Sequence, residues 1–331
     1  MIGFDKFKLV LGVYDIIITD EEKYTQKVKD GEIIEMEYRQ DYPFLLKIKI
    51  DYRKNESTIE FTGKVLLEEY HNLIRLSNIK KCIENINHFG GCEIKNYLSA
   101  EVCLCDAAND YNVCNTKSLT KFVYANLSNY KKYIAEPLSN GNFIIRKNVN
   151  TKQCKKRMTI YDKGGEMIKA ENLKFLETYY NGNNPFLDKC RFEINLNSKN
   201  QIRKSLKISD TSLKTVLLSA QHANPIYDFM NEILLKNDTP YSPPIKVAEY
   251  KTYCVLAQNN FDLDRVRAYY QVYKSKGTKI ANIMKPIIAC YEKIKNDKTA
   301  YTRSKVLELV TTETQITSHL ILEVCFGDVA V

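Results

Sequence analysis

The most informative stretch of the chain is Arg157-Met158-Thr159-Ile160-Tyr161-Asp162-Lys163-Gly164-Gly165-Glu166. Apolar and polar side chains alternate along it, as they do in a β-strand with one buried face. A strand here places Tyr161 and Lys163 side by side on one face, and the glycine pair predicts that the strand then ends. The stretch therefore predicts a tyrosine and a lysine together at a strand end.

A second alternating segment, residues 190–196, predicts a neighbouring strand. Arg191, Glu193 and Asn195 share one face of it. A dense positive cluster precedes the first strand and consists of Lys152, Lys155, Lys156 and Arg157. We expect tyrosine, lysine and carboxylates to converge on adjacent strands.

These segments resemble the replication initiators of filamentous phages, of the gene-two type, and the related initiation factors of rolling-circle plasmids. In that family a tyrosine-x-lysine-glycine-x-glutamate strand is followed, after a helix, by an arginine-x-glutamate strand. The matching motifs are residues 161–166 and 191–193. A third family feature, an acidic residue that ends a hydrophobic strand, is matched by Asp106. The resemblance covers residues 40–290 and implies a site-specific DNA nickase and strand-transferase that starts rolling-circle replication.

The resemblance also implies a role for each motif residue. Tyr161 attacks a phosphodiester, and Lys163 helps to remove the phenol proton. Mg²⁺ or Mn²⁺ neutralises the scissile phosphate, with Asp106, Glu166 and Glu193 as ligands. The DNA backbone is contacted by the basic residues Lys152, Lys155, Lys156, Arg157 and Arg191.

Other tyrosines are alternative nucleophiles, because the chain has 23 of them. Tyr179 and Tyr180 follow the central strand on a predicted helix, and Tyr270 lies with Tyr269 and Tyr273 in a tyrosine-rich helix. The four histidines are scattered and form no histidine-x-histidine pair, which many rolling-circle initiators use to bind metal. The sequence therefore leaves both the nucleophile and the metal ligands open.

The pattern of elements predicts an α+β protein with three parts. Residues 1–92 hold a hairpin, at 45–50 and 58–62, with helices over 65–87 and a loop or exposed helix over 20–37. Residues 93–236 form an antiparallel sheet with helices on one face, in which a strand ends at Asp106, and the resemblance implies that this is a catalytic domain like that of Rep nucleases. After a linker at 238–244, residues 245–331 form a small helical domain for DNA binding or oligomerisation.

Two helical segments of the last part, 261–275 and 280–295, have the spacing of a helix-turn-helix. Its basic residues are placed to contact phosphates, namely Arg265, Arg267 and Lys274. An ordinary helical hairpin with a solvated basic face is the alternative.

Composition limits the function classes. The 49 Lys and Arg against 40 Asp and Glu give a net charge of +9, which favours a polyanionic partner. The ten cysteines match no zinc pattern, and the charged start of the chain resembles no secretory signal, so we expect reduced thiols in a cytoplasm. No apolar run approaches the roughly 20 residues that span a bilayer.

The expected partner is therefore DNA, single- and double-stranded, with a host helicase or polymerase and a second copy of the chain as further candidates. A non-catalytic, sequence-specific DNA-binding regulator fits the charge and the helix-turn-helix spacing equally well. RNA binding through aromatic side chains on a sheet is a third reading, which no ribonucleoprotein-type motif supports.

Overall fold

The computed structural model describes residues 2–113, 115–127, 133–138, 142–147, 156–234, 247–259, 261–271, 279–295 and 301–315. The chain divides into two compact units. The first comprises residues 1–116, 130–229 and 310–331, and the second comprises residues 117–129 and 230–309. In the described part of the chain, no helix combines the length and the apolar character needed to cross a membrane.

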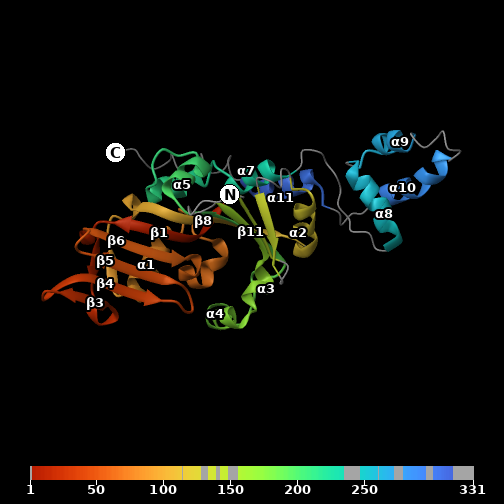
Figure 1. The fold of residues 1–331 in the computed structure, drawn as a ribbon. Coiled ribbons are helices and arrows are strands. Elements are labelled where there is room, and N and C mark those ends of the chain that lie inside the picture. Colours follow the sequence, from red (N-terminus) through yellow and green to blue (C-terminus); the bar gives the residue numbers. More distant parts are fainter. Residues whose placement is uncertain are drawn as a thin grey trace, which may run out of the picture. The chain divides into compact units, whose positions relative to one another are not determined.

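The first unit is built on a ten-stranded antiparallel sheet (Figure 1). Its strands run in the order β3-β4-β5-β6-β1-β8-β12-β11-β10-β9. Their bounds are β1 Gly3–Leu11, β3 Thr25–Lys29, β4 Glu32–Gln40, β5 Leu46–Asp51, β6 Glu56–Thr62, β8 Glu101–Asn112, β9 Tyr133–Pro137, β10 Phe143–Lys147, β11 Arg157–Asp162 and β12 Lys189–Leu196. Two short strands, β2 (Ile16–Ile18) and β7 (Cys92–Ile94), pair separately.

The strand order contains an internal duplication. Each half begins with a central strand, β1 or β8. The next four strands of the main sheet, β3 to β6 or β9 to β12, run in order from the sheet edge inward, and the last of them pairs with the central strand. The two central strands pair antiparallel, with Lys6 opposite Asp106. The predicted boundary between residues 92 and 93 is therefore wrong, because the sheet continues across it.

The two faces of the sheet differ in character. One is apolar and buried, and it carries Phe7, Leu9, Ile48, Ile59, Phe61, Ile160, Phe192 and Ile194. The other is polar and carries cross-strand ion pairs between lysine and glutamate. These pairs are Lys6 with Glu60 at 2.5 Å, Lys47 with Glu37 at 2.9 Å and Lys49 with Glu35 at 2.6 Å. Because of this alternation, the apolar face of the sheet packs into a hydrophobic core, whereas the polar face forms an accessible surface.

Helical segments border the sheet. The segment α1 (Ile79–Gly90) contacts β5 and ends at Gly91, whose φ of +60° suits glycine. Both α5 (Lys199–Leu206) and α6 (Leu213–Ser219) contact β8, and each begins at a serine cap. Further segments of this region are η3 Gly63–Asn72, α3 Lys163–Met167, α4 Ala170–Tyr180 and α7 Pro225–Ile233.

The prediction that helices lie on one face only is wrong. Cross-strand register places Arg191 on the same polar face as Glu193, because both alternate with buried Phe192 along β12. The Arg191 guanidinium nevertheless contacts Tyr70 of η3. Helical segments therefore cover one end of the polar face as well.

Several predicted elements are confirmed and others are corrected. The hairpin is β5 with β6, and the strand at 190–196 is β12. The predicted loop or helix at 20–37 instead contains β3 and much of β4. Asp106 lies in the middle of β8 and not at its end. Lys163 does not continue the strand of Tyr161, because β11 ends at Asp162 and Lys163 begins α3.

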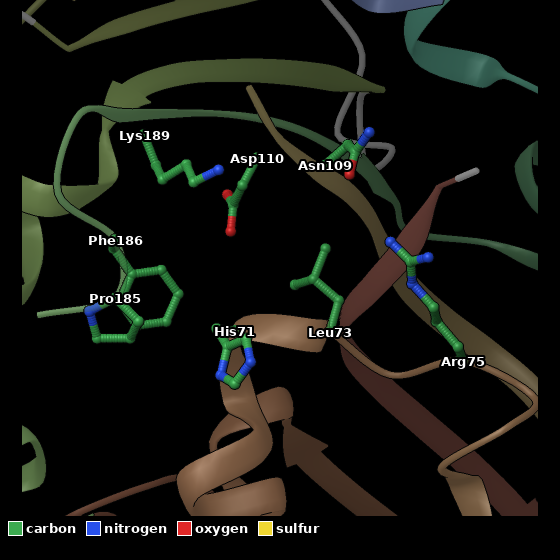
Figure 2. Close-up of a pocket in the computed structure, with 8 residues that line it drawn as sticks. All are labelled: His71, Leu73, Arg75, Asn109, Asp110, Pro185, Phe186 and Lys189. Atoms are coloured by element: carbon green, nitrogen blue, oxygen red, sulfur yellow. The ribbon is translucent and has the colours of Figure 1, made fainter. Parts of the chain in front are cut away.

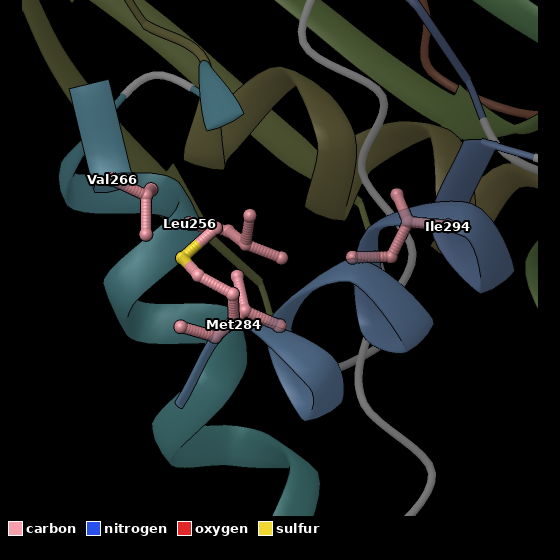
Figure 3. Close-up of a cluster of buried hydrophobic side chains, with 5 residues drawn as sticks. Leu256, Val266, Met284 and Ile294 are labelled. Atoms are coloured by element: carbon pink, nitrogen blue, oxygen red, sulfur yellow. The ribbon is translucent and has the colours of Figure 1, made fainter. Parts of the chain in front are cut away.

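The second unit contains most of α2 (Thr116–Ala125), with α8 (Val247–Gln258), α9 (Leu263–Gln271) and α10 (Ile280–Lys295). The helix α11 spans Arg303–Gln315. Helices α8 to α10 share a small apolar core of Leu256, Val266, Met284, Ile287 and Ile294 (Figure 3). The two predicted helices correspond to α9 and α10, whereas residues 272–278 between them and the predicted linker at 238–244 lie outside the described residues. The unit starts earlier than predicted, since it includes residues 117–129.

Close backbone packing of α3 gives a test of this fold. A methyl group on Gly164 would lie 2.8 Å from the backbone oxygen of Phe186, which cannot yield without moving the loop before β12. We expect Gly164→Ala to lower the free energy of unfolding by about 1 to 3 kcal/mol in urea titrations. Gly12→Ala is the control, because its methyl group meets only a side-chain oxygen of Asp15 at 3.2 Å. Equal stability of the two variants would contradict this packing.

Candidate functional site

Two carboxylates and one amide meet in the middle of the polar face. Cross-strand register pairs Asp106 of β8 with Asn195 of β12, and Ala108 with Glu193. The Asn195 amide donates from Nδ2 to Asp106 Oδ1 at 2.7 Å and to Glu193 Oε1 at 3.0 Å. One amide thus bridges two acids that lie on adjacent strands.

The electrostatics of these acids are unusual. Burial raises the pKa of Asp106 to about 6, while the hydrogen bond from Asn195 partly opposes this. Burial also raises the pKa of Glu193, to about 7, and the nearby charge of Asp106 adds to the effect. Both carboxylates are therefore short of compensating positive charge, which is the condition that favours binding of a proton or a metal cation.

The duplicated sheet contains a counterpart of this pair. Lys6 and Asp106 occupy equivalent positions on the two central strands. In the first half, Glu60 lies opposite the residue that is two positions after Lys6. In the second half, Glu193 lies opposite the residue that is two positions after Asp106. In the first half the two positions hold a lysine and a glutamate, which form an ion pair. In the second half they hold two acids. The same strand positions are thus neutral in one half and doubly acidic in the other.

Two further side chains complete this group. Arg157 of β11 donates from Nε to Asn195 Oδ1, which orients the amide so that its nitrogen faces the carboxylates. The Tyr161 hydroxyl donates to Glu193 Oε2 at 3.4 Å. Tyr161 is only 9% exposed, and its burial and the charge of Glu193 raise the pKa of the phenol well above 10. The structure therefore brings together Asp106, Glu193 and Tyr161 of the predicted site.

Glu166 and Lys163 do not join this group. The Lys163 amine, 2% exposed, donates to Glu166 Oε2 at 2.6 Å, and Asn172 donates to Glu166 Oε1 at 2.7 Å. The prediction that Glu166 shares a metal with Asp106 and Glu193 is therefore not supported by the geometry. No group of three His, Cys, Asp or Glu side chains is placed to hold a metal ion within the described ranges. Lys163 still lies near the predicted nucleophile, with its amine 5.6 Å from the Tyr161 ring centroid.

The prediction that Arg191 contacts DNA is wrong. Its side chain is fully buried and donates from Nε and Nη2 to the two oxygens of Asp110, at 2.6 and 2.7 Å. Its Nη1 donates to Asp5 at 2.8 Å and to the Tyr70 hydroxyl at 2.9 Å. A guanidinium engaged in this way links β12 and β8 to β1 and η3, and has no surface to offer a phosphate.

Two aromatic rings support both buried cations. The Lys163 amine lies 5.0 Å from the Tyr70 ring and 5.7 Å from the Phe186 ring. The Arg191 guanidinium carbon lies 5.3 and 5.8 Å from the same rings. Such distances suit cation–π attraction. Sequence reasoning missed Asp5, Tyr70 and Asp110; the only signal was the i, i+4 spacing of Asp106 and Asp110, which puts both on one strand face.

The remaining predicted residues lie elsewhere. Lys156 lies over the Phe229 ring at 5.3 Å, whereas Lys152, Lys155 and Lys274 lie outside the described residues. On α9, Arg265 pairs with Asp262 and Arg267 pairs with Asp264. Among the alternative nucleophiles, the Tyr180 hydroxyl lies 3.3 Å from His71 Nδ1. Tyr179 packs its ring against Phe175, and Tyr270 belongs to the second unit.

Comparisons with known proteins assign no family. No family model and no curated protein matches the sequence. A solved structure of Methanococcus jannaschii TBP is 13% identical, with a TM-score of 0.23, and the match covers 65% of this chain and 97% of that chain. A TM-score this low carries no argument about fold or function.

The Arg191 network gives a stability prediction. Replacing Arg191 by Met leaves the largely buried Asp5 and Asp110 without their cation, so we expect a loss of about 3 to 5 kcal/mol in urea unfolding. The control is Arg203→Met on α5, whose side chain is exposed. A loss below 1 kcal/mol for Arg191→Met would show that the network is not needed.

For the carboxylate pair we expect that removing a charge stabilises the protein, in contrast to the replacement of Arg191, and that the size of this effect depends on pH. Because the folded-state pKa of Glu193 is raised, the folded protein binds more protons than the unfolded chain between about pH 4.5 and 7, and loses stability as the pH rises through that window. We expect Glu193→Gln to stabilise the metal-free protein by on the order of 2 kcal/mol at pH 8 and to have little effect at pH 4.5.

Thermal and urea unfolding in chelator at the two pH values measures this difference. Glu60→Gln is the matched control, because it removes one partner of an ion pair on the same face and should not stabilise at pH 8. Destabilisation by Glu193→Gln at pH 8 would contradict the raised pKa.

Proposed function

We propose that this protein is a replication initiator that nicks one DNA strand in a metal-dependent reaction, with a Rep-nuclease-like sheet that carries the site on its polar face. The observation that carries the proposal is the pair of acids formed by Asp106, which is buried, and Glu193, which is partly buried, with the Tyr161 hydroxyl 3.4 Å from Glu193 Oε2. The pair occupies strand positions where the other half of the sheet has an ion pair. An excess of negative charge with a phenol beside it suits a site that takes a cation and a phosphodiester.

The donor set fits a hard divalent cation. Carboxylate oxygens are the ligands that Mg²⁺ and Mn²⁺ prefer, and Mg²⁺ commonly uses one or two carboxylates and keeps several waters. Asp106 and Glu193 are therefore the residues that would hold it, without Glu166. When bound, the metal supplies neutralisation of the phosphate charge.

The protein supplies the nucleophile and the acceptor of its proton. The Tyr161 oxygen attacks phosphorus, a phosphotyrosyl bond forms, and the bond to the 3′ oxygen breaks. The phenol proton passes to Glu193 Oε2, and the leaving 3′ oxygen takes a proton from solvent, so that a free 3′ hydroxyl results. Oε2 of Glu193 is the carboxylate oxygen that accepts the hydrogen bond of the Tyr161 hydroxyl, which places it to take the phenol proton. Arg157, exposed above the pair, contributes charge for the phosphate.

A second candidate is a non-catalytic DNA-binding regulator. The observation that favours it is the burial of Tyr161, which raises the phenol pKa and works against nucleophilic attack in this state. In this case the polar face binds DNA without cutting it.

A cleavage assay separates the two. The intact protein is incubated with supercoiled and single-stranded DNA from its own replicon, with Mg²⁺, Mn²⁺ or chelator. We expect metal-dependent nicking and a covalent protein–DNA adduct. Tyr161→Phe should abolish the adduct, and Glu193→Gln should slow nicking by about 10² or more. Tyr14→Phe is the control, because Tyr14 is 88% exposed.

The outcomes are distinct. An adduct that survives Tyr161→Phe would assign the attack to Tyr179, Tyr180 or Tyr270. Sequence-specific binding with no cleavage in any metal would sink the nickase and favour the regulator.

A further inference from the structure

Four polar side chains lie on four consecutive strands of the sheet. Tyr161 is on β11, Glu193 on β12, Asp106 on β8 and Lys6 on β1. Lys6 lies directly opposite Asp106. The position of Glu193 is shifted along the sheet by two residues from that of Asp106, and the position of Tyr161 is shifted by two more in the same direction. The four residues therefore form a diagonal across the polar face, with Tyr161 and Lys6 on opposite sides of the two acids.

The strand register also sets the spacing along this diagonal. Residues directly opposite one another on antiparallel strands have Cβ atoms roughly 5 Å apart, and diagonal neighbours are about 7 to 8 Å apart. Lys6 is therefore within reach of a group that lies over Asp106. At the other end, the Tyr161 hydroxyl contacts the pair through its hydrogen bond to Glu193 Oε2. A phosphodiester above the two acids thus lies between the Tyr161 hydroxyl and the Lys6 amine.

The Lys6 amine keeps donors for a further acceptor. It forms an ion pair with Glu60 Oε1 at 2.5 Å, on the side of β6, and its side chain is 25% exposed. An ammonium group has three N–H donors, so this ion pair leaves two of them. The lysines of the other two ion pairs on this face, Lys47 and Lys49, are both on β5. Of these three lysines, Lys6 is therefore the one beside Asp106.

The two ends of the diagonal differ in access. Arg191, which lies opposite Tyr161, is buried. Further along β12, residues of η3, β8 and the loop before β12 surround a cavity of about 270 Å³ (Figure 2). At the Lys6 end the sheet surface is open, since the side chains of Lys6 and Glu60 are 25% and 26% exposed. A DNA strand that reaches the two acids therefore continues over Lys6.

We propose that Lys6 is the general acid of the strand cleavage, which rests on the function proposed above. In an in-line displacement the attacking and leaving oxygens lie on opposite sides of phosphorus. Tyr161 attacks from one side of the acid pair, so the 3′ oxygen departs on the side of Lys6. As the bond from phosphorus to the 3′ oxygen breaks, the ammonium gives one proton to that oxygen, and the neutral amine regains a proton from solvent. The proton of the new 3′ hydroxyl thus comes from solvent by way of Lys6.

Replacing the leaving oxygen by sulfur tests this role. A thiolate departs without being protonated, so a strand with a bridging 3′ sulfur at the cleaved linkage requires no general acid. The linkage that the intact wild-type protein cleaves is mapped first, and single-turnover adduct formation with Mg²⁺ is then measured on matched oxygen and sulfur strands. We expect Lys6→Gln to slow adduct formation on the oxygen strand by about 10². On the sulfur strand we expect Lys6→Gln to react at the wild-type rate.

Two further variants separate proton donation from charge. Lys6→Arg keeps the positive charge and a partner for Glu60, but a guanidinium does not give up a proton near neutral pH. We therefore expect Lys6→Arg to be as slow as Lys6→Gln on the oxygen strand. Lys49→Gln is the control, because Lys49 forms the same kind of ion pair, with Glu35, on the same face but two strands away from Lys6. It should cleave both strands at the wild-type rate.

The outcomes separate this assignment from the proposed function. Equal slowing of Lys6→Gln on the two strands overturns the assignment and leaves the nickase standing. A wild-type rate of Lys6→Gln or Lys6→Arg on the oxygen strand does the same. If the wild-type protein forms no adduct, the nickase is overturned and the role of Lys6 with it. Circular dichroism shows whether each variant is folded, and a wild-type rate of Lys6→Gln on the sulfur strand shows that it still binds DNA.

Discussion

The burial of one guanidinium sets the arrangement of the first unit. Arg191 donates to Asp110 on the neighbouring strand and to Asp5 and Tyr70 in the first half of the sheet. A bulge between Phe4 and Lys6 accompanies the contact of Asp5 with Arg191. Burying a charge without such partners costs several kcal/mol, so these segments must assemble together. The network therefore joins the two halves, together with the pairing of the central strands and the contacts of η3 with α4.

The duplicated sheet explains why the neighbouring acids stand out. A sheet built twice offers the same strand positions twice, and one copy at these positions holds the ion pair of Lys6 with Glu60. Replacement of the lysine by Asp106 in the other copy leaves two carboxylates with one bridging amide. Such a pair costs folding stability at neutral pH, which is common where a site is shaped for a ligand and not for stability. This contrast within one chain is the basis of the functional proposal.

The sequence predicted the parts of the fold that have a strong local period. Strands β5, β6, β11 and β12 alternate cleanly, and each was expected where it lies. Strand β3 was missed because all five of its residues are exposed at the sheet edge, so that no alternation marks it. The duplication was missed because it resides in pairings between distant strands, such as Lys6 with Asp106, which no local pattern shows. For the site, the sequence suggested that Arg191 contacts DNA and that Lys163 assists the phenol; the structure shows that both side chains are buried and paired with carboxylates.

The central claim is that Asp106 and Glu193 together hold a divalent cation. Electron paramagnetic resonance of Mn²⁺ measures this most directly, by titration of the wild-type protein, Asp106→Asn, Glu193→Gln and the same-face control Glu60→Gln. The account predicts one saturable Mn²⁺ site in the wild-type protein and in Glu60→Gln, and loss of that site in the other two variants. Equal Mn²⁺ binding by wild type and Glu193→Gln would contradict it.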